Sequence, residues 1–591
     1  MDILITNVHG HEQYKKEWNE RASFGTFGVY TREVAQVDHF HSEVLENGKI
    51  FAFWFGSLYE VCSISEMHKR ALDNTLFDID GSFLYVEIDS EGKLKAYSER
   101  EGLIPIYYNY GGDGLEISTR QDVIQKEGDA DIDYSAVWDY LRYGLLIGSH
   151  TLSQSVRLLQ GGSLLVYSSK EVKIEKIRFF HHDASKEEYD TSKLMNELSD
   201  AFVAGIKKRI DRPSDEISVF LSGGMDSRMV LAAGNLVENT AFKATSFGQP
   251  DCEEVDIARK VSEVNGNQFY AIELQPKDHM DDAEEYARLT NGSDMSAQSY
   301  IINAAKKIRE HGITAFMTGS FLECHIGGTF LPESALTTTQ KLSEYLPQNM
   351  KNVKCELFPE TELRDLLVPG IYEQLFEGKT SNLIEEARQY DYFQVKDIIQ
   401  SFIIDNRDKR LVLNREIVPS QSLDYINPCF DKDFLEVASR IPAEKRFKRK
   451  FYRDFFVEKY PAYADVCYNN TTLPVSAPFE LWAEGSKNEY NREQMYVKLM
   501  QNGRKTYYPH FYSDMDGYSR YDETWKAFFN EMLLSPESVF IGKIIRRDKI
   551  ESMLSDHNCC KANYRKKLLN LASMELYFRL AQKRTNKKIE Q

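Results

Sequence analysis

The sequence offers no cysteine pattern that would hold a metal ion or a disulfide framework. Its eight cysteines include no CxxC pair among 591 residues, so neither a zinc ribbon nor a disulfide-stapled fold is expected. Cys559 and Cys560 are adjacent and lie near His557. Because adjacent cysteines rarely bind one metal ion together, we interpret them as a packed or surface pair, with a zinc site as the less favoured alternative.

The chain also lacks an excess of basic residues, a long apolar run and a leader-like start. Its formal net charge is −18, whereas nucleic-acid binding requires a basic surface. No apolar run approaches the roughly 18 residues that cross a bilayer, and the start, MDILITNVHGHEQYKKEW, has no basic segment followed by an apolar core. We therefore expect a cytoplasmic protein that spans no membrane and does not have nucleic acid as its main partner.

The length indicates more than one domain. A chain of 591 residues exceeds what a single hydrophobic core usually supports. Residues 179–193, FFHHDASKEEYDTSK, form a polar stretch poor in branched apolar side chains, which is typical of a connection between domains. We predict one domain over residues 1–180 and a second over residues 194–591, without internal repeats.

The two parts differ in their apolar pattern. Before the polar stretch, short alternating runs such as residues 82–88 and 94–97 are separated by turn residues, as in the hairpins of a layered antiparallel sheet. After it, strand-like runs alternate with helical periods, as a parallel sheet covered by helices requires. The predicted strands are residues 217–221, 241–247, 268–274 and 313–317, and the predicted helices begin at Ser227 or cover residues 253–264 and 296–310.

One stretch, SVFLSGGMDSRMV, combines a buried strand, a tight loop and a helix start. Gly223 and Gly224 let the backbone approach a ligand, and the helix N–H groups, with the hydroxyls of Ser222 and Ser227, favour an anion such as pyrophosphate. A carboxylate beside phosphates is repelled unless a cation lies between them, so we interpret Asp226 as a magnesium ligand. The alternative is a glycine turn with a helix-capping aspartate.

This loop resembles the SGGxDS loop of the asparagine synthetase family. TSFGQPDCEEVDIARKVSEVNG (245–266) resembles the family's second nucleotide strand, and MTGSFLECHIGG (317–328) resembles its SGEGSDExFGG segment. LDYINPCFD (423–431), KFYRDFF (450–456) and LLNLASMELYFRL (568–580) resemble later segments in the same order. The resemblance implies binding of ATP and Mg²⁺, adenylation of a carboxylate with release of pyrophosphate, and displacement of AMP by a nitrogen nucleophile.

The first part of the chain resembles the glutamine amidotransferase domain of the same family. DGSFLYVEID (80–89), SEREGLIPIYY (98–108) and RLLQGGSLLVY (157–167) resemble its motifs. The resemblance implies an α/β protein, with an Ntn-type amidotransferase-like α/β/β/α layer domain followed by a PP-loop synthetase domain with a parallel sheet. Glutamine-using members have a nucleophilic cysteine after the initiator methionine, whereas this chain has Asp2 and no cysteine before Cys62. We therefore expect a scaffold domain without glutaminase activity.

The synthetase part departs from the family pattern at its active-site loop. Alignment of Gly327 and Gly328 with the family's paired glycines places Glu323 at the magnesium-binding aspartate and Cys324 at the next glutamate. It places Ser320 at the glutamate that asparagine synthetases use near the reacting nitrogen. Glu323 keeps an oxygen ligand for Mg²⁺, whereas Ser320 removes a carboxylate base. The β-lactam synthetases and lasso-peptide cyclases of the family, which lack the nucleophilic cysteine, also vary at this position.

The acceptor side of the synthetase part is altered as well. Residues 415–420 stand where the family has its DRxSMA segment, and Ile426 replaces the arginine of LExRxP, which indicates a different or a decayed acceptor pocket. Glu385, Glu386 and Asp391 are candidates for the base that takes a proton from the amine. Carboxylates on a solvated helix face are the alternative interpretation of these three residues.

Lys450 is the candidate for stabilising the charge of the leaving pyrophosphate. A fixed ammonium near the α-phosphate would provide an electrostatic clamp. The spacing from Lys450 to Arg453 resembles the family's KxxLRxxF segment, and a shift of the register by one residue, to Arg449, stays open. A solvated lysine in a basic run is the alternative.

Four further residues lie at the strand ends that line the nucleotide crevice in this family. They are Phe220, Phe247, Thr318 and Gly319. Such crevices form at the carboxyl edge of parallel strands, so we expect these residues to contact the adenine and ribose of ATP. For Phe247, a place in the hydrophobic core is an equal alternative.

We therefore predict a carbon–nitrogen ligase that joins a small-molecule or peptide carboxylate to an amine in a specialised pathway, such as lasso-peptide macrolactam formation. A peptide substrate would imply a partner protein that delivers it. Ammonia-dependent asparagine formation is the alternative enzyme, and Ser320 disfavours it. A sulfur-transferring or tRNA-modifying PP-loop enzyme and a non-catalytic nucleotide-binding relative are alternatives of other classes. The tyrosine-rich residues 486–530 are expected to form either a substrate or partner surface or a packed insertion.

Overall fold

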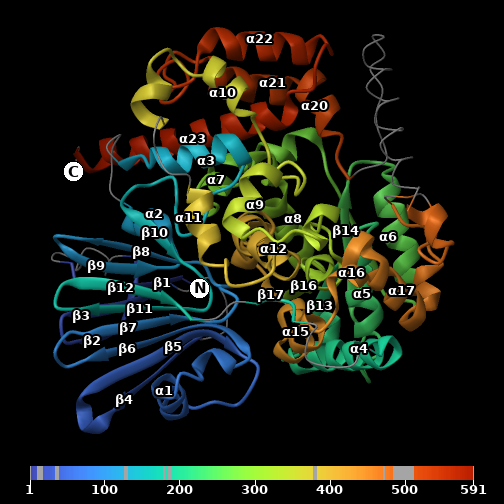
Figure 1. Ribbon diagram of the computed structural model, residues 1–591, viewed down its shortest axis with the longest axis horizontal. Helices are drawn as coiled ribbons and strands as arrows, with labels where there is room; N and C mark the ends of the chain where they lie inside the picture. The colour runs from blue at the N-terminus through green and yellow to red at the C-terminus, as the bar shows by residue number, and fades with distance from the viewer. Residues whose placement is uncertain are drawn as a thin grey trace. The chain divides into compact units, whose positions relative to one another are not determined.

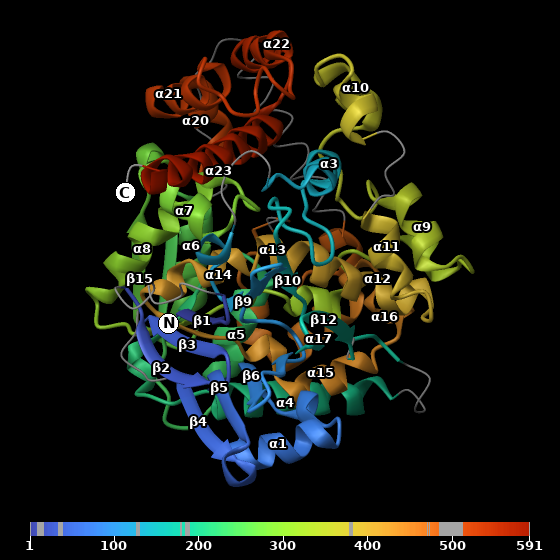
Figure 2. The ribbon, with the colours of Figure 1, turned by 90° about the vertical axis from the view of Figure 1, so that its left-hand side faces the viewer.

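The chain divides into two compact units, shown in two perpendicular views in Figure 1 and Figure 2. The first unit comprises residues 1–137, 146–180 and 584–591, and the second comprises residues 138–145 and 181–583. The structure is a computed structural model, and the residues that it describes are 2–8, 17–32, 39–125, 131–177, 180–183, 190–376, 382–469, 471, 473–483 and 512–589.

The first unit contains two antiparallel sheets, each with six strands in the described residues. One sheet has the order β10 (Val156–Leu159), β8 (Ile106–Gly111), β9 (Gly114–Ser118), β1 (Asp2–Thr6), β3 (Phe27–Arg32) and β2 (Asn19–Phe24). The other has the order β12 (Glu171–Lys176), β11 (Ser163–Ser168), β7 (Leu94–Ser98), β6 (Gly81–Asp89), β5 (Ile50–Leu58) and β4 (Phe40–Leu45). The runs that the sequence indicates as a hairpin are the neighbouring strands β6 and β7.

Strand β6 shows why the sequence of this unit alternates. Leu84 and Val86 enter the core between the two sheets, whereas Phe83 packs on the opposite face with helix α1 (Ile64–Leu72). On the outer face of the other sheet, helix α2 (Gln121–Ile124) contributes to a separate apolar cluster. The order of layers is therefore helix, sheet, sheet, helix, which confirms the expected α/β/β/α arrangement.

The second unit is built around a five-stranded parallel sheet with helices on its faces. The strand order is β15 (Phe269–Glu273), β14 (Lys243–Gly248), β13 (Ile217–Phe220), β16 (Ala315–Met317) and β17 (Asp424–Ile426). The helices that connect or cover these strands include α4 (Thr191–Lys208), α5 (Met225–Gly234), α6 (Glu253–Glu263), α7 (Ala283–Leu289) and α8 (Tyr300–Arg309). The α/β class predicted from the alternating pattern is confirmed.

The order of the parallel strands reverses once, between β13 and β16. The chain steps from β13 to β14 and β15 in one direction, and then returns past β13 to form β16. Because parallel connections are right-handed, α5 and α6 cover one face and α8 covers the other. Phe220 and Phe316 stack at a centroid separation of 4.5 Å and pack with Ile301 of α8. Such a reversal opens a crevice at the carboxyl ends of the strands.

A buried ion pair holds α4 against the segment that follows β17. Arg209, at the end of α4, donates from Nη1 to Oδ2 of Asp431 at 2.6 Å, and both side chains are almost fully buried. Lys208 also pairs with Asp431, at 2.9 Å. The second carboxylate oxygen of Asp431 accepts from the N–H groups of Asp433 and Phe434, at the start of α15 (Lys432–Ser439). Asp431 therefore links two helices and caps one of them.

Most of the remaining helices belong to the second unit, whereas α3 (Tyr134–Tyr143) begins in the first unit and α23 ends in it. They include α9 (Leu342–Asn349), α10 (Glu360–Leu366), α11 (Asn382–Arg388), α12 (Val395–Ile403), α13 (Lys409–Leu411), α14 (Asn414–Ile417), α16 (Ala443–Arg446), α17 (Lys450–Lys459), α18 (Pro461–Ala464), α20 (Met515–Tyr521), α21 (Glu523–Phe529), α22 (Arg547–Asn558) and α23 (Arg565–Ile589). None of the helices in the described residues has the length and apolar character needed to cross a membrane.

Only part of the tyrosine-rich segment 486–530 belongs to the described residues. Its residues 486–511 lie outside the described residues. The described remainder forms α20 and α21, in which Trp525 is fully buried and donates its indole N–H to the carbonyl oxygen of Pro276 at 2.9 Å. This part of the segment is therefore a packed element of the second unit.

Candidate active site

The loop between β13 and α5 has the form that an anion-binding loop requires. The backbone N–H of Ser222 donates to Oγ of Ser227 at 3.0 Å, and the N–H of Gly224 donates to Oγ of Ser222 at 3.1 Å. These bonds close the loop upon itself just before α5 begins at Met225. The first turn of α5 supplies N–H groups that have no partner within the helix and the positive end of the helix dipole, so the loop can hold phosphate oxygens.

Two glycines allow other backbone segments to reach this loop. A Cβ at Gly319 would lie 2.1 Å from the carbonyl carbon of Asp226, and a Cβ at Gly223 would lie 2.6 Å from the Cβ of Asn469. Arg228, two residues after Asp226, donates to the carbonyl oxygens of residues 463, 466 and 467. The loop is therefore enclosed between the end of β16 and the segment around Asn469.

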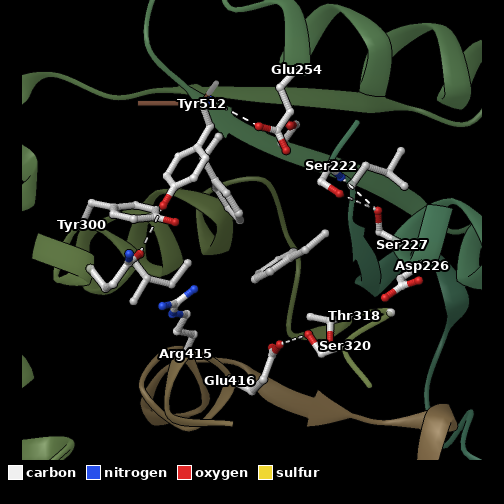
Figure 3. A pocket seen from close by; sticks show the side chains of 17 residues that line it. Ser222, Asp226, Ser227, Glu254, Tyr300, Thr318, Ser320, Arg415, Glu416 and Tyr512 are labelled. Atoms are coloured by element: carbon white, nitrogen blue, oxygen red, sulfur yellow. Dashed lines mark hydrogen bonds between the residues drawn. The ribbon is translucent and has the colours of Figure 1, made fainter. Parts of the chain in front are cut away.

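A cavity of about 340 Å³ lies at the carboxyl ends of β13, β14 and β16 (Figure 3). Seven of the nine residues expected to contact ATP line it, namely Phe220, Ser222, Asp226, Ser227, Phe247, Thr318 and Gly319. The other two, Gly223 and Gly224, form the backbone of the loop. Phe247 also packs edge to face against Phe220 at 5.1 Å, so it combines the lining and core positions considered for it.

Two carboxylates, Asp226 and Glu323, lie close enough to interact electrostatically beside this loop. Asp226 accepts a hydrogen bond from the hydroxyl of Tyr452 at 2.7 Å, and Glu323 accepts from Thr329 and pairs with Arg449. Burial and the nearby charge of Glu323 raise the pKa of Asp226 to about 7, while Tyr452 and Arg449 act in the opposite direction. The two carboxylates repel each other, and a cation between them would relieve that repulsion.

Mg²⁺ fits this donor set. It is commonly bound by one or two carboxylates together with phosphate oxygens, rather than by a complete protein cage. In the described part of the chain no group of three or more His, Cys, Asp or Glu side chains could hold a metal ion by itself. Asp226 and Glu323 would therefore hold Mg²⁺ jointly with the phosphates of a nucleotide bound at Ser222–Ser227, and the ion would neutralise phosphate charge.

The structure does not bring Lys450 to this pair of carboxylates. Its exposed side chain pairs with Asp454 at 2.5 Å, one turn along α17. Lys448 and Arg449 both have positive φ, at 55° and 63°, and turn the chain just before α17. This turn directs Arg449, the residue at the alternative register, to Glu323, with which it pairs. A guanidinium is a strong phosphate ligand, and it remains protonated.

Glu416 is a candidate functional residue that the sequence analysis did not identify. It lies in α14, is 5% exposed, lines the cavity and accepts a hydrogen bond from Oγ of Ser320 at 2.6 Å. Burial raises the pKa of Glu416 to about 7, although the hydrogen bond from Ser320 acts in the opposite direction. A carboxylate therefore lies beside Ser320, which the resemblance aligns with a glutamate, and it comes from a residue 96 positions away.

The carboxylates proposed as bases from the sequence do not line the cavity. Glu386 accepts from the side chain of Gln389 at 2.8 Å, and Asp391 accepts from Ser343. Glu385 lies on the exposed face of α11. The far end of the cavity is instead lined by Arg415, Tyr300 and Tyr512.

In the first unit, Asp2 is a buried ion-pair residue. Its side chain is 4% exposed and pairs with Arg32 at 2.5 Å and with Arg120 at 3.6 Å. The N–H of Ile3 donates to Oγ1 of Thr119 beside it. Asp2 is therefore a carboxylate paired with two guanidinium groups.

Comparisons with known proteins find a family model and solved structures that are similar to parts of the chain. A family model described as asparagine synthase matches residues 197–493, about half of the chain. Glutamine phosphoribosylpyrophosphate amidotransferase from B. subtilis, complexed with ADP and GMP, is 10% identical, and the match covers 55% of this chain and 75% of that chain at a TM-score of 0.19. A structure of the allosteric regulatory enzyme of purine biosynthesis is 9% identical, with 55% and 74% covered at a TM-score of 0.19. Comparison with curated proteins finds no match.

Proposed function

The chain belongs to the asparagine synthase family, and we propose that it is an AMP-forming amide ligase that works without its own glutaminase. One observation supports this proposal most strongly. A single cavity contains a loop suited to phosphates and, separately, the buried carboxylate of Glu416. The first suits activation of an acid by ATP, and the second suits removal of a proton from an amine.

The first step would join the acid to AMP. An oxygen of the substrate carboxylate attacks the α-phosphorus of ATP, and the bond to the β-phosphate oxygen breaks. The departing pyrophosphate would be held by Ser222, Ser227 and the loop N–H groups. Arg449 pairs with Glu323, and when Glu323 binds Mg²⁺ instead, Arg449 would stabilise the charge of the pyrophosphate. The products of this step are an acyl-adenylate and pyrophosphate.

The second step would form the amide. The amine attacks the acyl carbon, the bond to AMP breaks, and the proton lost by the nitrogen passes to Glu416. A base with a pKa near 7 is well matched to this role, because it is partly ionised at neutral pH and still accepts a proton. Ser320 would orient the carboxylate through its 2.6 Å hydrogen bond.

We favour a specialised substrate, such as the peptide or natural-product acid of a reaction like lasso-peptide macrolactam formation. We expect the reaction to take place in the cytoplasm. Asp2 supports independence from glutamine, because its carboxylate is occupied by Arg32 and Arg120 and is no nucleophile for an amide. The expected ligands are therefore an acid and an amine, each of them a small molecule or part of a peptide. A peptide substrate would require a protein partner for delivery.

Ammonia-dependent asparagine formation is the second candidate. The objection to it from the sequence was the loss of a carboxylate at Ser320. Glu416 supplies a carboxylate that is hydrogen-bonded to that serine, so this objection loses its force. The two candidates differ in whether aspartate and ammonia suffice as substrates.

The proposal is tested by ATP–pyrophosphate exchange. The full-length protein is incubated with ATP, labelled pyrophosphate, Mg²⁺ and a panel of aspartate, other small acids and peptides. We expect exchange that depends on one class of acid and disappears when Mg²⁺ is removed with a chelator. Exchange with aspartate, followed by asparagine formation from ammonia, would establish the second candidate. ATP binding without exchange for any acid would overturn the ligase proposal.

The rate of amide formation should depend on pH through Glu416. Because burial raises the pKa of Glu416 to about 7, the fraction in the ionised, proton-accepting form grows as pH rises through 7. Ser320→Ala removes the hydrogen bond that favours the ionised form, so the rising limb of kcat should move to higher pH. Measurement of kcat from pH 5.5 to 9 in both proteins checks this, and an unchanged limb in Ser320→Ala would contradict it.

A further inference from the structure

The far end of the cavity carries a positive charge that the proposed steps do not use. Arg415 lies across the cavity from Ser222 and Ser227, and its guanidinium points into the open space (Figure 3). Its side chain is 39% exposed, although it is surrounded by the walls of the cavity. The phosphates of ATP would be held at the opposite end, so Arg415 is available to another ligand.

The guanidinium of Arg415 is held in place by the buried carboxylate of Asp294. Its Nε faces Oδ2 of Asp294 at 3.3 Å, and Asp294 is 2% exposed. Asp294 also accepts from the hydroxyl of Tyr286 at 2.7 Å and from the N–H of Met295 at 2.8 Å. An anchored Nε leaves the two terminal nitrogens free to present a fork of donors, and such a fork recognises a carboxylate through two parallel hydrogen bonds.

Arg415 is next in sequence to Glu416, and both side chains line the same cavity. The pair places a carboxylate-binding cation beside the group that is proposed to receive a proton from an amine. A ligand that binds to Arg415 and Glu416 at once therefore carries a carboxylate and an amine a short distance apart. We propose that the amine acylated by this protein is a free α-amino acid, whose carboxylate is bound by Arg415 and whose nitrogen faces Glu416. The proposal rests on the amide-ligase function stated above, with the amine on a separate molecule and not within one peptide as in macrolactam formation.

An aromatic wall next to Arg415 suits the side chain of such an amino acid. The rings of Tyr300 and Tyr512 lie 5.8 Å apart, and the hydroxyl of Tyr512 donates to Oε1 of Gln298 at 3.3 Å. The backbone N–H of Tyr512 donates to the side chain of Glu254 in α6, which fixes the backbone of Tyr512 beside the cavity. The wall offers apolar ring surface close to the charged pair, as in pockets that bind amphipathic small molecules.

The test is a binding measurement that needs no turnover. The full-length protein, saturated with Mg²⁺ and α,β-methylene-ATP, is titrated calorimetrically with each of the twenty common amino acids and with the amide of each one that binds. We expect at least one amino acid to bind and its amide to bind at least tenfold more weakly. Arg415→Met should weaken binding of that amino acid by about ten- to a hundredfold, and Arg415→Lys by less.

A control variant separates this role from a general structural effect. Arg288→Met removes an arginine that pairs with Glu285 on α7, outside the cavity lining, and should leave amino-acid binding unchanged. Equal affinity of the amino acid for Arg415→Met and the unchanged protein would overturn the proposal, as would the absence of binding by all twenty.

The outcome also distinguishes this inference from the ligase proposal. Binding confined to aspartate and glutamate, and dependent on their side-chain carboxylate, would assign Arg415 to the acid that is adenylated and would overturn the inference. Acid-dependent ATP–pyrophosphate exchange without amino-acid binding would retain the ligase and remove the inference. Arg415-dependent amino-acid binding without exchange would retain the site and remove the ligase.

Discussion

Replacing Glu416 with glutamine is expected to lower the rate of amide formation by roughly 10²- to 10⁴-fold, the usual contribution of a positioned general base. Acid-dependent ATP–pyrophosphate exchange should change little, because Glu416 lies away from the loop that holds the phosphates. Glutamine keeps the shape of the side chain and can accept the hydrogen bond of Ser320, but it accepts no proton. Parallel assays of exchange and of amide product measure the two steps separately.

Asp226→Asn provides the contrast to Glu416→Gln. It weakens the proposed magnesium site and should abolish exchange and amide formation together. The Glu416→Gln protein should also be no less stable than the unchanged protein at pH 8. A group with a raised pKa contributes to stability at low pH, and that contribution is lost as pH rises through its folded pKa, here about 7. If Glu416→Gln reduced exchange and amide formation equally, Glu416 would be a binding or structural residue.

Replacing Arg209 with methionine is expected to reduce the free energy of unfolding by about 3 kcal/mol, near the lower end for a broken buried ion pair. The loss arises because Asp431 keeps its buried charge, and it stays near that lower end because Lys208 still pairs with Asp431 at 2.9 Å. Urea unfolding followed by circular dichroism measures the difference. Lys208→Met, which removes the more exposed partner, is the matched control and should lower stability by at most about 1 kcal/mol.

The deficit of Arg209→Met should depend on pH. Burial alone would raise the pKa of Asp431, but the charge of Arg209 and the hydrogen bond from Lys208 outweigh it and hold the pKa below its ordinary value. A lowered pKa contributes stability above the unfolded value of about 4, and this contribution is lost as pH falls through the folded value. The difference between the two proteins should therefore be largest near neutral pH and shrink below pH 4. A pH-independent difference would indicate lost packing instead.

The nucleotide end of the site could be predicted from the sequence because its signals are local. Ser222 and Ser227 are five residues apart, and the apolar runs on either side of the loop already indicate a strand and a helix. The same applies to the hairpin of β6 and β7, in which the period of two is visible in the residues themselves. Here the motif and the structure carry the same information.

The other end of the site could not be predicted, because contacts between distant residues create it. Glu416 meets Ser320 across 96 positions, and Arg415 meets Asp294 across 121 positions. The resemblance indicated an altered acceptor pocket at residues 415–420, but no local pattern shows which of their side chains enter the cavity. The choice between Lys450 and Arg449 depended on two consecutive residues with positive φ, which a sequence pattern does not reveal.

The separation of these contacts has a consequence for how the protein folds. The phosphate loop closes within six residues, whereas the pairing of Ser320 with Glu416 closes a loop of about a hundred residues, and the entropy lost on closure increases with loop length. The two ends of one cavity thus differ in contact order. Local opening around α14 would leave the phosphate loop folded. The protein would then still bind a nucleotide after the proton acceptor has left the cavity.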